Sequence, residues 1–170
     1  MNKGLCHLYS GDGKGKTTAA MGLVLRALGN GLRVVVVQFL KGQPTGEAAL
    51  LRSLGAQVLR DEPDTKFVFQ MDEAEKAACR KAQTQRLAQA LEMPCDVLVL
   101  DEACAACALG MVDEALLRRA VLERPAGREV VLTGRDPAPW MCEAADYHTQ
   151  MRCVRHPYDA GVGARKGIEY

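Results

Sequence analysis

Short apolar runs alternate along this chain with longer segments in which apolar residues recur at every third or fourth position. A continuous run such as Val34–Val37 is typical of a strand buried on both faces of a parallel sheet. The wider spacing predicts amphipathic helices, and glycine and proline residues separate the two kinds of segment. The apolar runs predict strands at Leu5–Tyr9, Arg33–Phe39, Gln57–Leu59, Val97–Asp101 and Glu129–Thr133, with a sixth candidate at His148–Cys153.

Helical spacing fills most of the gaps between these runs, and stop signals support it. Gly29 and Gly55 directly follow apolar-periodic segments, and Pro125 lies just beyond another. The predicted helices are Thr17–Leu28, Glu47–Leu54, Asp72–Leu91, Asp113–Leu122 and Ala138–Ala145. Alternating strands and helices predict an α/β fold, a mostly parallel sheet with helices on both faces. The segments with neither pattern are Leu40–Gly46, Arg60–Gln70 and Arg155–Tyr170.

The composition excludes some classes of function and is consistent with the predicted fold. The 170 residues, 48% hydrophobic and 25% charged, suit a single domain spanning residues 1–170. Charges nearly cancel, 22 Lys and Arg against 21 Asp and Glu, which disfavours nucleic-acid binding through a broad basic surface. The apolar runs are shorter than the roughly 20 residues of a membrane helix. The first strand leaves no room for a signal peptide, and seven cysteines, an odd number, suit reduced thiols. We therefore expect a cytoplasmic protein.

The segment Ser10–Thr18 follows the first strand and opens the first helix, and it nearly matches the phosphate-loop pattern, with Ser10 in place of the first glycine. Its three glycines let backbone N–H groups turn toward one anion, beside the positive end of a helix dipole. The competing interpretation is a glycine-rich turn with a solvated lysine. The spacing of Lys16 and Thr17 favours an ATP site in a single phosphate-loop domain of the RecA-like kind. The candidate binding residues are Gly11, Asp12, Gly13, Lys14, Gly15, Lys16, Thr17 and Thr18.

A second buried strand, Val97–Asp101, ends in two carboxylates, Asp101 and Glu102. Ligands gather at the carboxyl ends of strands in open α/β sheets, so these groups are candidate Mg²⁺ ligands or hold its waters, with Thr17 as a further ligand. The alternative is an acidic pair that caps a helix. Arg135, at the end of another strand, is either a phosphate or ribose contact or a surface residue in a turn.

Five segments taken in order resemble one family. They are residues 11–20, 36–42, 99–102, 132–135 and 151–170. Together they resemble the ATP:corrinoid adenosyltransferases of cobalamin synthesis and salvage, the CobA/BtuR/CobO group. The resemblance implies that a reduced cob(I) corrinoid attacks C5′ of ATP and releases triphosphate. It also implies that ATP lies in the phosphate loop reversed relative to common ATPases.

The same resemblance assigns expected roles to individual residues. Lys16 neutralises the leaving triphosphate, and Lys41 and His156 join the set of binding residues. Phe67 and Phe69 match the aromatic segment that displaces the lower axial ligand of cobalt, although two phenylalanines packed in an ordinary core are the alternative. The resemblance further implies a homodimer and a flavin-type reductase as partners.

Two departures and two alternative functions remain open at this point. Asp12 stands where the family often has Asn, and Cys104 and Cys107 stand where it commonly has other residues. The spacing of the two cysteines would place them on one face of a helix. They are either a pair of metal ligands or small packing residues. One alternative function is a kinase or ATPase in which Glu102 orients a nucleophile toward the γ-phosphorus. The other is a nucleotide-dependent corrinoid carrier without turnover.

Overall fold

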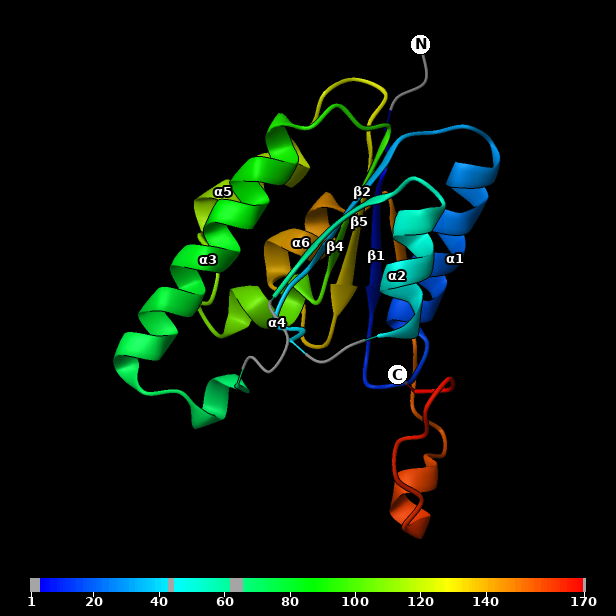
Figure 1. Ribbon diagram of the computed structural model, residues 1–170, viewed down its shortest axis with the longest axis vertical. Coiled ribbons are helices and arrows are strands. Elements are labelled where there is room, and N and C mark those ends of the chain that lie inside the picture. The colour runs from blue at the N-terminus through cyan, green and yellow to red at the C-terminus, as the bar shows by residue number, and fades with distance from the viewer. Residues whose placement is uncertain (1–3, 43–44, 62–65, 170) are drawn as a thin grey trace.

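The computed structural model describes residues 4–42, 45–61 and 66–169, and its centre is one sheet of six parallel strands (Figure 1). The order across the sheet is β3-β2-β4-β5-β1-β6, and each pairing is parallel. Parallel neighbours need crossover connections, which the helices supply. The strands are β1 (Cys6–Ser10), β2 (Val34–Gln38), β3 (Gln57–Arg60), β4 (Val97–Asp101), β5 (Glu129–Gly134) and β6 (Tyr147–Gln150).

Helices cover both faces of the sheet, as the sequence predicts (Figure 1). One face carries α1 (Lys16–Gly29) and α2 (Gly46–Ser53). The opposite face carries α3 (Glu73–Glu92), α4 (Ala103–Ala108), α5 (Glu114–Leu122) and α6 (Pro139–Ala144). Two single-turn 3₁₀ helices, η1 (Val68–Gln70) and η2 (Pro157–Ala160), lie in the segments without a sequence period. None of the helices in the described ranges has the length and apolar character needed to cross a membrane.

Alternation along the strands builds two separate cores. In β2, Val34 and Val36 pack under α1 and α2, whereas Val35 and Val37 pack under the four helices of the other face. All four side chains are essentially inaccessible to solvent. Because both faces are covered, β2 and β4 read as continuous apolar runs rather than as alternating ones, which is why the sequence locates them so well.

The predicted elements are confirmed with shifts of a few residues at their ends, and three details differ. The sheet is entirely rather than mostly parallel. Helix α4 was not predicted as an element, since its residues are all alanine or cysteine and carry no apolar period. Strand β6 ends at Gln150 rather than at Cys153, because the chain leaves the sheet there to run beside the phosphate loop.

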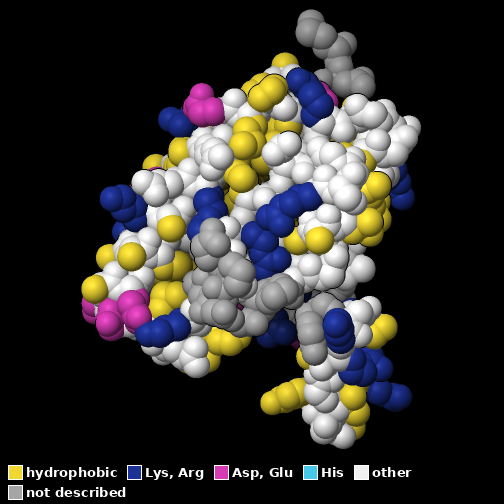
Figure 2. Space-filling view, viewed as in Figure 1, with side chains coloured by type: hydrophobic (Ala, Val, Ile, Leu, Met, Phe, Trp, Pro, Cys, Tyr) yellow, Lys and Arg dark blue, Asp and Glu magenta, His cyan; other side chains and the backbone are white. Residues whose placement is uncertain are grey.

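The chain after β6 forms a separate feature of the molecule. It passes the end of β1 and then projects from the body with η2 at its tip (Figure 1). Lys and Arg side chains as well as hydrophobic ones line this C-terminal segment (Figure 2). Val154, Tyr158 and Ile168 are among its exposed hydrophobic residues. The segment therefore reaches the phosphate loop without belonging to either core.

Candidate active site

The phosphate loop connects β1 to α1 at the carboxyl edge of the sheet. Gly15 occupies the N-cap position of α1 with φ of 119°, a conformation that residues with a Cβ rarely adopt. The Lys16 ammonium folds back over the loop and donates to the Gly13 carbonyl oxygen at 2.7 Å. Burial lowers the pKa of Lys16, and the positive charge of Arg135 adds to this effect. The loop therefore presents a helix N-terminus and a concentrated positive charge to one cavity.

The C-terminal segment makes backbone hydrogen bonds with the phosphate loop. The Met151 N–H donates to the Ser10 carbonyl at 2.8 Å, and the Gly13 N–H donates to the Met151 carbonyl at 2.8 Å. A Cβ on Gly11 would lie 2.3 Å from the Met151 oxygen, so glycine is required for this close approach. The Gly13 N–H is thus engaged with Met151, contrary to the expectation that it faces the anion.

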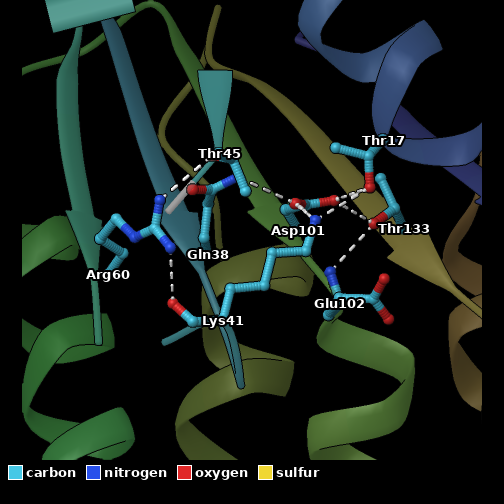
Figure 3. Close-up of polar contacts among 8 residues, drawn as sticks. All are labelled: Thr17, Gln38, Lys41, Thr45, Arg60, Asp101, Glu102 and Thr133. Atoms are coloured by element: carbon cyan, nitrogen blue, oxygen red, sulfur yellow. Dashed lines mark hydrogen bonds and ion pairs between the residues drawn. The ribbon is translucent and has the colours of Figure 1, made fainter. Parts of the chain in front are cut away.

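Asp101, at the end of β4, is completely buried and organises the polar centre of the site (Figure 3). Its Oδ1 accepts from the hydroxyl groups of Thr17 at 2.9 Å and Thr133 at 2.7 Å. Its Oδ2 accepts from the Lys41 ammonium at 2.6 Å and from the Gln38 amide at 3.3 Å. Four donors from four different segments therefore hold one carboxylate in place, as a buried charge requires.

Glu102, the next residue, turns the other way and lines the cavity beside the phosphate loop. Its φ of 61° is left-handed, and its backbone N–H donates to the Thr133 hydroxyl at 2.9 Å. Burial raises the pKa of the Glu102 carboxyl, and the Lys41 ammonium partly opposes the shift. Glu102 stands at the N-cap of α4 but its side chain makes no capping hydrogen bond. Helix capping therefore does not explain this carboxylate.

The cavity in front of the loop has a volume of about 940 Å³ and gathers most of the predicted binding residues. Arg135 lines it and donates to the Asp12 carbonyl at 3.5 Å. Lys14 reaches the Ile168 carbonyl at 3.3 Å, so the C-terminal segment forms one wall. His156 also lines the cavity, while its Nδ1 accepts from the Tyr158 N–H and caps η2. The lining thus comes from both ends of the chain.

The Asp12 carboxylate accepts a hydrogen bond from the backbone of the C-terminal segment. Its Oδ1 accepts from the Cys153 N–H at 3.0 Å, and this hydrogen bond lowers the pKa of the carboxyl. The negative charge that this residue brings to the loop is therefore turned toward the C-terminal segment and helps to anchor it.

Phe67 and Phe69 stack on each other with ring centroids 5.5 Å apart and an interplanar angle of 10°. Their side chains are 56% and 82% exposed, so neither belongs to a core, and the interpretation as ordinary core packing is wrong. Phe67 lines the large cavity and also a second, apolar one of about 510 Å³, which Phe69 lines as well. The aromatic pair therefore stands at the border between two cavities. Residues 62–65, which precede it, lie outside the described residues.

The two cysteines of interest, Cys104 and Cys107, lie on α4. Cys104 is completely buried against Gly134, and burial raises its pKa to about 12. Within residues 4–42, 45–61 and 66–169 no group of three or more His, Cys, Asp or Glu side chains could hold a metal ion. The burial of Cys104 against Gly134 supports the interpretation as small packing residues.

Several residues of the site were missed by the sequence analysis. They are Gln38, Thr133, His148 and Met151. Gln38 is the last residue of β2 and Thr133 the last but one of β5, so both lie at the carboxyl edge, a position that the strand predictions already indicated. His148 contacts the Ser10 hydroxyl at 2.8 Å, and this contact depends on β6 lying beside β1. No local signal marks Met151, because its contacts join opposite ends of the chain.

Gly134 tests the packing behind this site. Its φ is 147°, and an added Cβ would lie 2.5 Å from the Cβ of Cys104. Gly134→Ala is expected to lower the free energy of unfolding by about 2–4 kcal/mol, since overpacking and backbone strain combine. Thermal or urea unfolding measures the effect. Gly22→Ala is the matched control, because nothing lies within 4 Å of its added Cβ and alanine favours a helix interior. Equal stabilities for the two variants would contradict the tight approach of β5 to α4.

Comparison with known proteins bears on what this arrangement does. A family model described as "ATP:corrinoid adenosyltransferase BtuR/CobO/CobP" matches residues 2–170. The chain is 37% identical over 171 residues to a protein named corrinoid adenosyltransferase from Pseudomonas aeruginosa, covering 99% of this chain and 84% of that one. It is 36% identical over 169 residues to a protein named corrinoid adenosyltransferase from Escherichia coli K12 and to one named corrinoid adenosyltransferase CobA from Salmonella typhimurium, covering 99% of this chain and 86% of each relative.

Proposed function

The chain belongs to the ATP:corrinoid adenosyltransferase family, and we propose that it transfers the 5′-deoxyadenosyl group of ATP to the cobalt of a reduced cob(I) corrinoid. One observation supports the location of this reaction in the molecule. The cavity that contains the phosphate loop also contains the ring of Phe67, and the same ring lines the neighbouring apolar cavity. A nucleotide site and an apolar site therefore meet at one exposed aromatic residue.

For this reaction the protein must position the two substrates and compensate the charge of the leaving triphosphate. The cob(I) substrate supplies an electron pair that forms the cobalt–carbon bond, and the bond between C5′ and oxygen breaks, so the leaving triphosphate takes its electron pair. No general base is needed, because no proton is removed. The chain must hold C5′ in line with the nucleophile and stabilise the triphosphate. Lys16 and the N-terminus of α1 face the cavity where the triphosphate would lie.

We propose that ATP lies reversed in this loop, with the γ-phosphate end where common ATPases hold the α-phosphate. This orientation directs C5′ away from the loop and toward the cavity wall formed by Phe67. Arg135 and Lys14 line the same cavity and suit contacts to phosphate oxygens. The corrinoid would then approach from the apolar side.

We propose that Mg²⁺ accompanies ATP at this site. The donors present fit it, because the Thr17 hydroxyl, the Glu102 carboxylate and the Asp101 carboxylate are oxygens, which Mg²⁺ prefers. Thr17 donates its proton to Asp101 and accepts a hydrogen bond from Lys41, so one lone pair of its hydroxyl oxygen remains for a metal ligand. Glu102 faces the cavity directly, whereas Asp101 lies behind Thr17 and Lys41. The ion supplies charge compensation for the triphosphate when bound.

We propose that Phe67 and Phe69 lie against the lower face of the corrinoid and exclude its lower axial ligand. Both rings are exposed and stacked on each other, and the cavity they line is largely apolar. Aromatic rings that bury their apolar surface against the corrinoid occupy the space below the cobalt and exclude the nitrogen base, which favours the ligand-free form of cob(II). That form accepts an electron more readily.

The remaining features of the proposal rest on the resemblance to the family. We propose that the enzyme acts in the cytoplasm as a homodimer and receives a corrinoid that a flavin-type reductase reduces.

The direct test of the activity follows the corrinoid. Chemically reduced cob(I)alamin is incubated with the protein, ATP and MgCl₂, and the light-sensitive absorption spectrum of the cobalt–carbon bond is recorded. We expect the spectrum to appear only with ATP present. Binding of both substrates without any light-sensitive product would contradict the proposed function.

The role of Glu102 gives a separate prediction. Glu102→Gln is expected to raise the Mg²⁺ concentration needed for half-maximal turnover by about tenfold or more, because a charged ligand becomes neutral. The unfolding midpoint is expected to stay unchanged, since the side chain makes no capping bond. Glu114→Gln is the control, as its carboxylate pairs with Arg118 on the surface of α5. An unchanged Mg²⁺ titration in Glu102→Gln would leave this residue with a structural role only.

A further inference from the structure

The Lys41 ammonium lies on the same oxygens that the Mg²⁺ proposal uses (Figure 3). Its Nζ is 2.6 Å from Asp101 Oδ2 and 3.1 Å from Thr17 Oγ1. The Lys41 side chain is 22% exposed and the Asp101 side chain is fully buried. A buried carboxylate needs a partner charge, and in this structure Lys41 provides it.

The geometry of Thr17 makes this contact incompatible with a metal ion in the same place. The hydroxyl of Thr17 donates its proton to Asp101 Oδ1, so only its lone pairs remain for other partners. The Lys41 ammonium uses one of them and also faces Asp101 Oδ2. A divalent cation bound to Thr17 beside Asp101 would stand within contact distance of the ammonium, and two cations that close repel strongly. One must leave when the other arrives.

The backbone around Lys41 is fixed, so the side chain is the part that can move. Leu40 adopts a left-handed conformation with φ of 55°, which is strained for a residue with a Cβ. On one side, the Phe39 N–H donates to the Asp101 carbonyl at 3.0 Å. On the other, the Lys41 carbonyl accepts from the Arg60 guanidinium at 3.0 Å. Lys41 also lines the large cavity, so its ammonium can turn into that space without a change of the backbone.

We propose that Lys41 is the resident counter-cation of Asp101, that the divalent cation displaces it, and that the displaced ammonium then contacts the triphosphate. This inference rests on the proposed nucleotide site. It makes Lys41 a residue that couples metal binding to phosphate binding, because the ammonium gains its new partner only when both ligands are present. Metal without nucleotide is disfavoured by the same contact.

The proposal predicts effects of opposite sign in one variant. Lys41→Met is expected to tighten binding of Mn²⁺ alone by about tenfold or more, within the 5- to 150-fold range of about 1–3 kcal/mol typical of coupled sites. In the same variant, binding of tripolyphosphate in the presence of Mg²⁺ is expected to weaken by about tenfold, because one charge-assisted contact is lost. A merely structural lysine would weaken both. Electron paramagnetic resonance of free Mn²⁺ and calorimetry with tripolyphosphate measure the two effects.

Matched variants separate this effect from a general loss of positive charge. Lys14→Met removes one charge from the same cavity but leaves Asp101 and Thr17 paired with Lys41, so Mn²⁺ affinity is expected to change by less than about threefold. Lys41→Arg keeps a cation and is expected to bind Mn²⁺ about as weakly as the unaltered protein. The double variant Lys41→Met/Asp101→Asn is expected to lose the gain, because the vacated carboxylate becomes neutral.

The outcomes distinguish this proposal from the proposed function. If Lys41→Met, or Lys41→Gln where the first variant fails to fold, binds Mn²⁺ no more tightly than the unaltered protein, the proposal is overturned. A tight site in Lys41→Arg would overturn it too, since charge would not be responsible. If the metal and tripolyphosphate results hold but no adenosylated corrinoid forms, the proposed function fails while the coupling by Lys41 stands.

Discussion

Lys16→Ala is expected to reduce the affinity for ATP by about 30- to several-thousandfold, corresponding to about 2–5 kcal/mol for removing one partner of a desolvated charge pair. The helix dipole of α1 is equivalent to only about half a charge, whereas a triphosphate carries several. Lys16 lies folded over the loop, with its Nζ 2.7 Å from the Gly13 carbonyl, where it can exchange that neutral acceptor for phosphate oxygens. Lys14, the other lysine of the loop, donates instead to the Ile168 carbonyl of the C-terminal segment at 3.3 Å.

Calorimetry with ATP and Mg²⁺ measures this loss, and Lys81→Ala is the control. Lys81 is exposed on α3, on the opposite face of the sheet from α1. Its removal changes the net charge equally and is expected to leave ATP affinity within about twofold, since exposed charges at that distance are screened. Near-normal ATP affinity in Lys16→Ala would contradict the assignment of Ser10–Thr18 as the triphosphate site.

Phe69→Ala is expected to separate the two halves of the reaction. The variant should bind ATP normally and should transfer the adenosyl group when cob(I) is supplied by a strong chemical reductant. It should fail when cob(II)alamin must be reduced on the enzyme by a weak flavin donor. Burying an aromatic side chain contributes about 1.5–3 kcal/mol, and about 1.4 kcal/mol is tenfold in an equilibrium. Loss of the ring is therefore expected to reduce the ligand-free cob(II) population by roughly ten- to a hundredfold.

The structure sharpens this prediction by giving the two phenylalanines different surroundings. Phe69 lines only the apolar one of the two cavities, so its effect is expected to be confined to the corrinoid. Phe67 lines both cavities, so Phe67→Ala is expected to weaken ATP binding as well. Leu122→Ala, at an exposed leucine of α5, is the control for loss of surface apolar area.

Electron paramagnetic resonance of cob(II)alamin with enzyme, Mg²⁺ and ATP reads the effect directly, because four-coordinate Co(II) has its own spectrum. If both phenylalanine variants give the same four-coordinate signal as the unaltered enzyme, the aromatic pair does not activate cobalt.

The sequence predicts well those parts of the fold that depend on local patterns of residues. The runs that became β2 and β4 are apolar because both of their faces are covered, and Gly15 is required by the turn into α1. Helix α4 escaped prediction because six alanine and cysteine residues have no polar face to reveal a period. It is a helix because it packs small side chains against β5, and that reason lies in the tertiary structure.

The candidate site divides in the same way. Thr17, Asp101 and Glu102 were predicted to meet because the phosphate loop follows β1 and the end of β4 lies at the same edge of the sheet, and the structure brings the first two into contact. The position of Lys41 on Asp101 depends on the left-handed turn at Leu40, which no residue type announces. The contact of Met151 with Gly13 joins positions far apart in the chain and depends on where β6 ends. Sequence therefore indicated which groups lie together at this edge of the sheet, and the long-range contacts decide how they are held.

The identity of the phosphorus product is the most direct measure of what this enzyme does. The protein is incubated with ATP, Mg²⁺ and chemically reduced cob(I)alamin, and phosphorus nuclear magnetic resonance records the product as adenosylated corrinoid accumulates. Transfer of the 5′-deoxyadenosyl group predicts one intact triphosphate for each cobalt–carbon bond formed. Release of ADP and phosphate would indicate phosphoryl transfer at the γ-phosphate, and unchanged ATP would indicate a carrier without turnover; either result would contradict adenosyl transfer at this site.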